Sequence, residues 1–219
     1  MGPSGSGKTT LLNLLATIDT PTSGTVWVDG VNVSKLRGEA LAAFRRKKLG
    51  FVFQDYNLLD SLSIGENIAL PLVLDRKPPS FIKKRVKEIS TQLGIEALLD
   101  RFPYEVSGGQ QQRAAIARAI VHEPALILAD EPTGNLDSRS ARALMDTFTL
   151  INSTVETTIL MVTHDPFAAS FCQNVYFIRD GRLYAEMHKR DDRRMFFRQI
   201  MDALSQMGGG YCEHLADSL

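Results

Sequence analysis

The chain has no excess of charge of either sign, few cysteines and no long apolar run. Lys and Arg together number 25, as do Asp and Glu, whereas nucleic-acid-binding proteins carry a basic excess, so we expect no nucleic-acid partner. Cys172 and Cys212 are the only cysteines, too few for a disulfide framework and typical of a reducing compartment. No apolar run approaches the roughly 18 residues that span a bilayer, so we expect any membrane role to come through a partner. No internal repeat is present.

What the chain does have is enough apolar sequence for a buried core. It contains 219 residues, of which 44% are hydrophobic. These values predict a globular protein of one domain, or of one domain with a small subdomain.

A glycine-rich stretch at residues 2–9, GPSGSGKT, fits the pattern G-x-x-x-x-G-K-[ST]. Glycines let the backbone bend so that successive N–H groups point at phosphate oxygens. Lys8 would supply a positive charge to the β and γ phosphates, and the Thr9 hydroxyl would bind Mg²⁺. Residues 10–16 read as a helix whose positive N-terminus faces the anion. The alternative is a flexible Gly/Ser linker.

Three apolar runs at residues 49–53, 125–129 and 157–163 read as buried strands of a parallel sheet. Each run ends in polar residues, and ligands bind at the carboxyl ends of such strands. The first run is followed by Gln54 and the last by His164, although either residue alone is weak support for a ligand site. The middle run ends in Asp130 and Glu131.

An acidic pair at the tip of an apolar strand is costly unless it serves a metal or a reaction. We expect Asp130 to hold Mg²⁺, through water, and Glu131 to polarise an attacking water. The alternative is a surface turn, which the apolar strand before it disfavours.

Helical signals dominate the section between the first two strands. Ser63 is placed to cap a helix, and residues 80–100 and 108–121 also read as helices. Ser107, at the start of the last of these, is followed by two glycines and Gln110. Open backbone donors at a helix N-terminus suit an anion, so we expect a second phosphate-contacting site here; the alternative is an ordinary serine cap.

Hairpins are predicted at residues 25–33 and 175–186, because Asp29-Gly30 and Asp180-Gly181 suit two-residue turns. Residues 39–48 read as a helix with a basic end. Beyond residue 187, Phe197, Ile200, Leu204 and Met207 recur at helical spacing. This short amphipathic helix is expected to pack on its own domain rather than on a membrane. Residues 211–219 carry no signal.

Taken in order, these motifs resemble the complete set of an ABC-type ATPase: Walker A, Q-loop, signature, Walker B, D-loop and switch histidine. Asp137 stands at the D-loop position, and Val106 replaces the leucine that most often opens the signature. The resemblance implies an α/β P-loop NTPase fold, with a mostly parallel sheet, flanking helices, a small antiparallel β part and an inserted helical subdomain. The domains implied are residues 1–187, with the helical subdomain at about 55–120, and a C-terminal extension at 188–219.

The resemblance also implies roles for single residues and a dimer in which two ATPase subunits pack head to tail around ATP. Catalytic roles fall to Glu131 as general base, His164 as γ-phosphate sensor, and Gln54. Mg²⁺ would be held by Thr9, Gln54 and Asp130. The residues implied in nucleotide binding are Gly2, Ser4, Gly5, Ser6, Gly7, Lys8, Thr9, Thr10, Ser107, Gly108, Gly109, Gln110 and Asp137.

A narrower resemblance concerns the kind of transporter. Residues 53–59 and 131–137 are similar to the branch that serves lipoprotein release, macrolide export and antimicrobial-peptide resistance, whose ATPases pair with FtsX-like permeases. Residues 180–184, 195–197 and 208–210 are similar to the bacitracin-resistance subgroup, where the permease often couples to a sensor histidine kinase. This implies a peripheral subunit at the cytoplasmic face of the membrane, with a groove for the permease formed by residues 54–59 and 60–105.

Other readings predict other sequence features. Lipoprotein release and macrolide export remain alternatives within the branch. A soluble ABC protein of DNA repair or translation would need a tandem ATPase, a coiled-coil insertion or a zinc module. A non-hydrolysing regulator is disfavoured by Glu131 and His164, and a small-molecule kinase would lack the segment 107–110. The family has about two strands before the phosphate loop, which the sequence given does not show, so we expect this chain to be poorly soluble and to bind nucleotide weakly.

Overall fold

A computed structural model describes residues 1–155, 157–190 and 192–208, which form two compact units. The larger unit comprises Thr9–Val162. The smaller unit combines Met1–Lys8 with the chain from Thr163 onward.

The larger unit is built on a parallel sheet of β3 (Leu49–Phe53), β4 (Leu126–Asp130) and β5 (Thr158–Val162), in the order β3-β4-β5. This confirms the predicted parallel sheet. The last residues of the three strands are in register, because Phe53 pairs with Asp130 and Asp130 with Val162. The polar residues that follow therefore emerge at one edge of the sheet. The prediction that β5 is buried is wrong: its first residue is exposed and the next three are half-buried, since β4 is its only strand neighbour among the described residues of this unit.

One face of this sheet is covered by α1 (Lys8–Leu15), with α2 (Gly38–Lys48) and the small hairpin of β1 (Trp27–Val28) and β2 (Val31–Asn32) beside it. Leu12 of α1 packs against Leu49 and Leu128 in a core cluster that includes Phe44 of α2. The predicted first hairpin is confirmed: both turn residues have positive φ, as a type I′ turn requires. A 3₁₀ turn at Val33–Lys35 follows.

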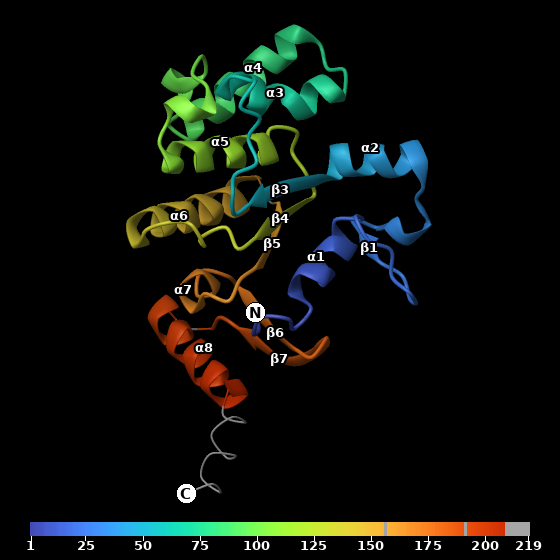
Figure 1. Cartoon of the computed structure of the whole chain (residues 1–219), viewed down its shortest axis with the longest axis vertical. Helices are drawn as coiled ribbons and strands as arrows, with labels where there is room; N and C mark the ends of the chain where they lie inside the picture. The colour runs from blue at the N-terminus through green and yellow to red at the C-terminus, as the bar shows by residue number, and fades with distance from the viewer. Residues whose placement is uncertain (156, 191, 209–219) are drawn as a thin grey trace, which may run out of the picture. The chain divides into compact units, whose positions relative to one another are not determined.

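Helices α3 (Ile64–Leu74), α4 (Pro79–Gln92) and α5 (Gly108–Ile120) gather at one end of the larger unit (Figure 1). Ser63 caps α3 in a capping box, in which Glu66 N–H donates to Ser63 Oγ at 3.2 Å and Ser63 N–H donates to Glu66 Oε2 at 2.8 Å. The predicted helix over 80–100 is wrong at its end. Gly94, with a φ of +66°, terminates α4, and only the 3₁₀ turns Glu96–Leu98 and Pro103–Glu105 follow before α5.

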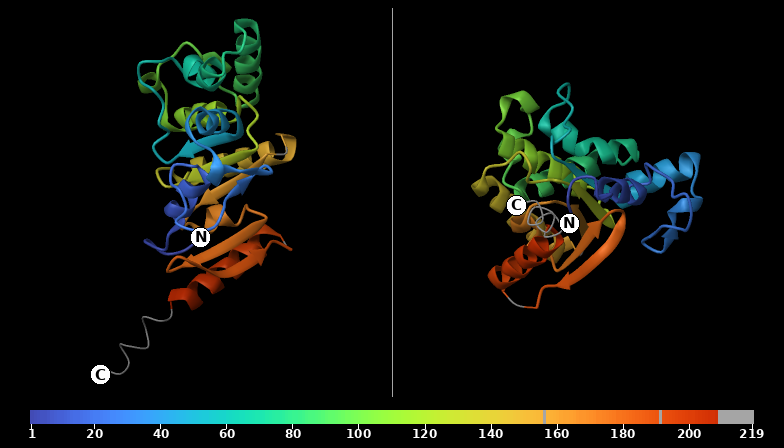
Figure 2. Two further views of the ribbon diagram at one scale, coloured as in Figure 1. Left: turned by 90° about the vertical axis from the view of Figure 1, so that its right-hand side faces the viewer. Right: turned by 60° about the horizontal axis from the view of Figure 1, so that its bottom comes forward.

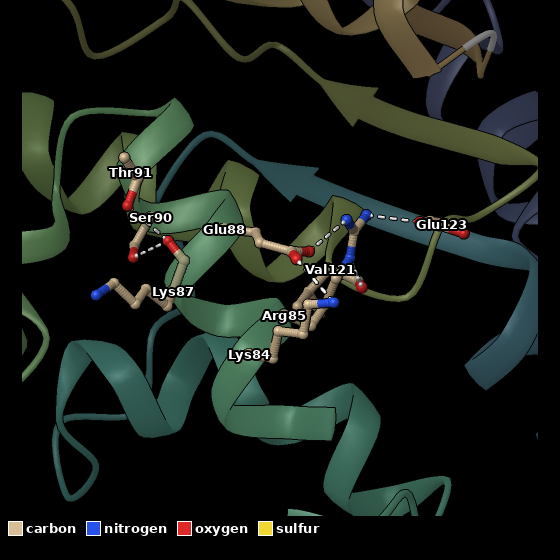
Figure 3. Close-up of polar contacts among 8 residues, drawn as sticks. All are labelled: Lys84, Arg85, Lys87, Glu88, Ser90, Thr91, Val121 and Glu123. Atoms are coloured by element: carbon tan, nitrogen blue, oxygen red, sulfur yellow. Dashed lines mark hydrogen bonds and ion pairs between the residues drawn. The ribbon is translucent and has the colours of Figure 1, made fainter. Parts of the chain in front are cut away.

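Arg85 ties α4 to the connection between α5 and β4 (Figure 3). Its Nε donates to the Val121 carbonyl at 3.1 Å, and its Nη2 lies 2.9 Å from Glu123 Oε1. A third contact, at 3.4 Å, joins Nη1 to Glu88 on α4 itself. The helical part is therefore held at the point where the chain enters the central strand. The last helix of this unit is α6 (Ser138–Val155).

The smaller unit contains the hairpin of β6 (Asn174–Arg179) and β7 (Arg182–His188), the short helix α7 (Pro166–Ala169) and α8 (Arg193–Gly208). Both views of Figure 2 show α8 beside the hairpin, where Phe196 and Ile200 pack with Val175 and Phe177. The amphipathic helix is thus confirmed and packs on its own unit. Of the residues whose spacing predicted this helix, Phe197 is half-buried, and its neighbour Phe196 is the buried aromatic.

Residue 1 also joins this hairpin. Its N-terminal amine donates to the Tyr176 carbonyl at 2.6 Å, and Ile178 N–H donates to the Met1 carbonyl at 2.8 Å. This is the hydrogen-bond pattern of a parallel pair centred on Phe177. Throughout residues 1–155, 157–190 and 192–208, no helix has the length and apolar character to cross a membrane.

Candidate functional site

The phosphate loop at residues 2–8 rests on the β6–β7 turn of the smaller unit. Gly2 has a φ of +151°, and a Cβ there would lie 2.1 Å from the Ile178 carbonyl oxygen, so only glycine fits. Gly181 N–H donates to the Ser6 carbonyl at 3.0 Å. Gly5 and Gly7 also have positive φ. The loop is therefore a fixed, sharply bent structure rather than a flexible linker.

Lys8 turns its side chain back onto this loop. Its Nζ donates to the carbonyls of Gly2 and Pro3 at 2.9 and 2.8 Å, and the residue is buried. The Ser6 hydroxyl is also buried and has no hydrogen-bond partner among the described residues. A buried cation beside an unsatisfied hydroxyl suits a phosphate group, which would accept from both. Helix α1 begins at Lys8, and the residues predicted beside the phosphates, Ser4, Thr9 and Thr10, are exposed.

In the larger unit, Gln54, Asp130 and Glu131 come together at the carboxyl edge of the sheet. Gln54 directly follows Phe53, the register partner of Asp130. Glu131 N–H donates to the Val162 carbonyl at 2.9 Å, which fixes this residue against the end of β5. Glu131 has a φ of +43°, a left-handed conformation that costs about 1–3 kcal/mol in a residue with a side chain and is concentrated at functional sites.

The loop after Glu131 reaches back to the end of β3. Gln54 Nε2 donates to Asn135 Oδ1 at 2.9 Å, and Asn135 Nδ2 donates to Asp55 Oδ1 at 2.8 Å. A Cβ on Gly134 would lie 2.9 Å from the Gln54 amide carbon, so Gln54 packs directly over this glycine. The segment that follows β3 and the segment that follows β4 are thus joined through side chains.

The residues after Asp55 are held by α5. Tyr56 and Asn57 both adopt a left-handed backbone conformation. Arg118 of α5 donates to their carbonyls, at 2.9 Å to Tyr56 and 2.5 Å to Asn57. The Tyr56 hydroxyl lies 3.1 Å from where a Cβ on Gly108 would stand. Burial, followed by the charge of Asp55, raises the pKa of Tyr56, so this hydroxyl stays neutral beside the start of α5.

Ser107 is the N-cap of α5, as predicted. Its carbonyl accepts from Gln110 N–H at 2.9 Å, and its own N–H donates to Gln110 Oε1 at 2.8 Å. Gly109 is exposed, with open space where a Cβ would stand. The first turn of α5 therefore presents small residues at a positive helix end, which suits a phosphate group.

A cavity of about 290 Å³ opens between the starts of α5 and α6. Ser107 and Gln110 line one side, and Leu136 and Ser140 line the other. The starts of α5 and α6, which carry the predicted signature and D-loop residues, thus share one recess. Gln112 also lines it; this residue is 3% exposed, and its amide has no hydrogen-bond partner among the described residues.

Asp137 caps α6. Its Oδ1 accepts from the N–H groups of Arg139 and Ser140 at 2.9 and 3.0 Å, and its Oδ2 accepts from the Ser140 hydroxyl at 2.6 Å. These bonds, the Ser140 hydroxyl first, hold the pKa of the Asp137 carboxyl below its usual range. This carboxylate is therefore charged at neutral pH and positions the helix that follows the D-loop.

His164 belongs to the smaller unit and is exposed. The segment around it is fixed by Asp165, whose N–H donates to Thr163 Oγ1 at 2.9 Å and whose Oδ1 accepts from Phe167 N–H at 2.8 Å. Asp165 caps α7 in this way. The histidine thus stands on a structured turn between β5 and α7.

The predicted metal donors Thr9, Gln54 and Asp130 supply a hydroxyl, an amide oxygen and a carboxylate. An all-oxygen set of few protein ligands suits Mg²⁺, which keeps several waters and binds substrate phosphates. No cluster of three or more His, Cys, Asp or Glu side chains in the described part of the chain could hold a metal by itself. The donor chemistry fits a cation that arrives with a nucleotide.

Three residues of this region were not found by sequence reasoning: Asn135, Arg118 and Asn67. Asn67 is fully buried in α3, and Leu59 N–H donates to its Oδ1 at 2.8 Å. The two hydrogens of its Nδ2 are shared among three carbonyls at 3.0–3.1 Å, those of Leu59, Leu62 and Ser63. It fixes the segment between the Q-loop and α3. A polar residue inside the apolar face of a predicted helix is a signal that could have identified Asn67. Asn135 and Arg118 act across about 60–80 positions of sequence, and no local pattern reports such contacts.

Comparison with known proteins establishes the class. The sequence model of the ABC transporter family matches residues 1–134, and the chain belongs to this family as an ATP-binding subunit and an ATPase. It is 56% identical over 209 residues to the ABC transporter ATP-binding protein YxdL of Bacillus subtilis, covering 95% of this chain and 81% of that one.

Two further relatives bear on function and fold. The bacitracin export ATP-binding protein BceA of Halalkalibacterium halodurans is 49% identical, covering 98% of this chain and 85% of its own. A dimeric, post-hydrolysis structure of the ATP-binding cassette MJ0796 bound to ADP and Pi superposes with a TM-score of 0.77 at 38% identity, covering 87% of this chain and 84% of the other. The predicted P-loop ATPase fold is therefore confirmed.

Proposed function

We propose that this chain powers an FtsX-like permease in resistance to antimicrobial peptides of the bacitracin type. The observation that carries this proposal is the similarity to a bacitracin export ATP-binding protein over 98% of the chain. The resemblance of residues 180–184 and 195–197 to the same subgroup supports it. On this proposal the chain acts at the cytoplasmic face of the membrane through its permease, which in turn couples to a sensor histidine kinase.

The proposed chemistry is mainly positioning and charge stabilisation. Loop N–H groups and Lys8 bind the phosphates of ATP, while Ser107 and Gly109 of a second copy, packed head to tail, contact the γ-phosphate. Glu131 polarises the attacking water, and His164 holds the γ-phosphate. Mg²⁺, bound through Thr9, Gln54 and Asp130, would supply charge neutralisation at the phosphates.

Glu131→Gln tests the assignment of the general base. Removing a general base slows hydrolysis about 10²- to 10⁴-fold, so we expect turnover to fall at least about 10²-fold while ATP affinity is retained. Turnover by phosphate release and affinity by equilibrium binding would be measured on the same preparation. Unchanged turnover would remove Glu131 from the mechanism.

Four exposed apolar side chains in and beside the helical part are candidates to contact a permease helix. Leu59, Val73, Leu74 and Phe81 are 45–57% exposed and lie between the Q-loop and the start of α4. Exposed apolar side chains are common in protein interaction sites, and amphipathic helices dock onto such side chains. We propose that these four side chains receive a cytoplasmic helix of the permease.

A double charge substitution tests this surface. Leu74→Glu with Phe81→Glu should abolish co-purification with the co-expressed permease and abolish bacitracin resistance, while the basal ATPase rate of the isolated chain is unchanged. Leu183→Glu, at a comparably exposed position on β7, is the matched control and should bind the permease normally. Normal co-purification of the double variant would refute the proposed surface.

A further inference from the structure

We infer that Asp55 and Asn135 form a relay that sets the orientation of the Gln54 side-chain amide and presents its carbonyl oxygen to the metal. Asn135 is then a positioning residue for the ATPase reaction. The inference rests on the proposed role of Gln54 as a metal ligand, and it adds two residues to which no role has been assigned.

An ionised Asp55 carboxylate can only accept hydrogen bonds. The group of Asn135 that lies 2.8 Å from Asp55 Oδ1 must therefore be the donating Nδ2. Asn135 Oδ1 then faces Gln54, and because an oxygen there can only accept, the Gln54 atom 2.9 Å away must be Nε2. The charge of Asp55 thus determines which way round both amides lie.

The consequence concerns the other end of the Gln54 amide. With Nε2 committed to Asn135, the carbonyl oxygen Oε1 is the atom left for a cation, which binds oxygen and not an amide nitrogen. An unrestrained glutamine samples both amide orientations, and one of them would present Nε2 to the cation. The relay removes that orientation before the metal arrives, as outer partners of metal ligands do.

The surroundings hold the relay in place. Asp55 directly precedes Tyr56 and Asn57, whose carbonyls are held by Arg118. Gly134 lies under the Gln54 amide, and a Cβ there would meet the amide carbon and nitrogen at 2.9 and 3.0 Å. Asn135 lies on the same loop as Glu131, between β4 and α6. The relay therefore connects the orientation of the Gln54 amide with the loop that carries the proposed general base.

The relay predicts a specific loss in metal affinity. Removing an outer partner of a metal ligand costs about 10- to 100-fold in affinity; because these side chains are exposed, we expect the low end, about tenfold, for Asn135→Ala. Asp55→Asn should cause an intermediate loss, since an amide at position 55 no longer dictates the orientation. ADP affinity without metal should be unchanged in both variants.

The experiment uses the full chain with ADP and Mn²⁺ as the probe. The dissociation constant of Mn²⁺ from the ADP complex is measured by electron paramagnetic resonance, and ADP binding without metal by calorimetry. Asp60→Asn, an exposed acid on the same loop, is the matched control for charge and should behave as the unaltered chain. In a Gln54→Ala background, Asn135→Ala should have no further effect.

A second readout is independent of metal. In the nucleotide-free protein the side-chain NH₂ resonances of Gln54, identified by their loss in Gln54→Ala, should show slowed solvent exchange that Asn135→Ala removes. Retained slow exchange, or a Mn²⁺ dissociation constant within twofold of the unaltered chain in Asn135→Ala, would overturn the relay. A Gln54→Ala variant with normal Mn²⁺ affinity would instead refute the proposed role of Gln54 itself, which separates the two failures.

Discussion

Gly50 allows β3 to approach α5, and replacing it should destabilise the larger unit. A Cβ at this position would lie 2.3 Å from the Ala119 carbonyl oxygen and 3.2 Å from both the Ala119 carbonyl carbon and Pro124 Cγ. Since ordinary contacts begin at 3.4 Å, β3 or α5 would have to move by about 1 Å. Two of the three obstacles are backbone atoms, which cannot move by a side-chain rotation.

Overpacking of this kind costs about 1–3 kcal/mol, and because the obstacle is backbone we expect about 3 kcal/mol for Gly50→Ala. For a chain of this size the midpoint of thermal unfolding should fall by about 6–12 °C. Unfolding in urea, followed by circular dichroism, gives the free energy directly.

Gly109→Ala is the matched control for stability, because nothing lies within 4 Å of a Cβ there and the residue is in the first turn of α5. Its stability should rise by about 0.5–1 kcal/mol, as for Gly→Ala in an open helix position. If Gly50→Ala melts within a degree of the unaltered chain, the close packing of β3 on α5 is refuted.

Two further predictions concern residues that hold the helical part and the sheet together. Asn67→Ala should lower the free energy of unfolding by about 2–4 kcal/mol, measured in urea, because it removes a fully buried amide that binds one backbone N–H and shares its two hydrogens among three carbonyls. A loss below about 1 kcal/mol would contradict this account. Burial lowers the pKa of His122 below its ordinary 6.5, although the Leu49 carbonyl and Asp75 act in the opposite direction. The folded state therefore disfavours the proton, and the free energy of unfolding should decline as the pH falls below about 6.5. His122→Gln, which retains a donor for the Leu49 carbonyl, should weaken that decline between pH 7 and 5, and an unchanged pH profile would show that another group causes it.

Local patterns were enough to predict the elements that carry the motifs. The strand before Gln54 and the strand before Asp130 and Glu131 are continuous apolar runs with polar ends, and both hairpins carry Asp-Gly turns whose residues adopt positive φ. Such signals depend only on neighbouring residues, so they survive without knowledge of the fold.

Features that depend on tertiary context were missed or misplaced. The end of α4 followed Gly94 and not the apolar spacing that continued beyond it. Adjacent phenylalanines at 196 and 197 offer two helical phases, and only packing on the β6–β7 hairpin selects the first. The partners of Asn135 and Arg118 are distant in sequence and are determined by how the strand ends and α5 meet.

The Gly2 and Pro3 carbonyls give Lys8 two hydrogen-bond acceptors within its own loop. Its ammonium donates to both of these carbonyls, at 2.9 and 2.8 Å, and so braces the bend of the loop from within. Nucleotide binding then becomes an exchange in which neutral carbonyl acceptors give way to charged phosphate oxygens, which bind an ammonium more strongly. The same exchange runs backward when product leaves, and the lysine can return to the carbonyls instead of facing solvent alone.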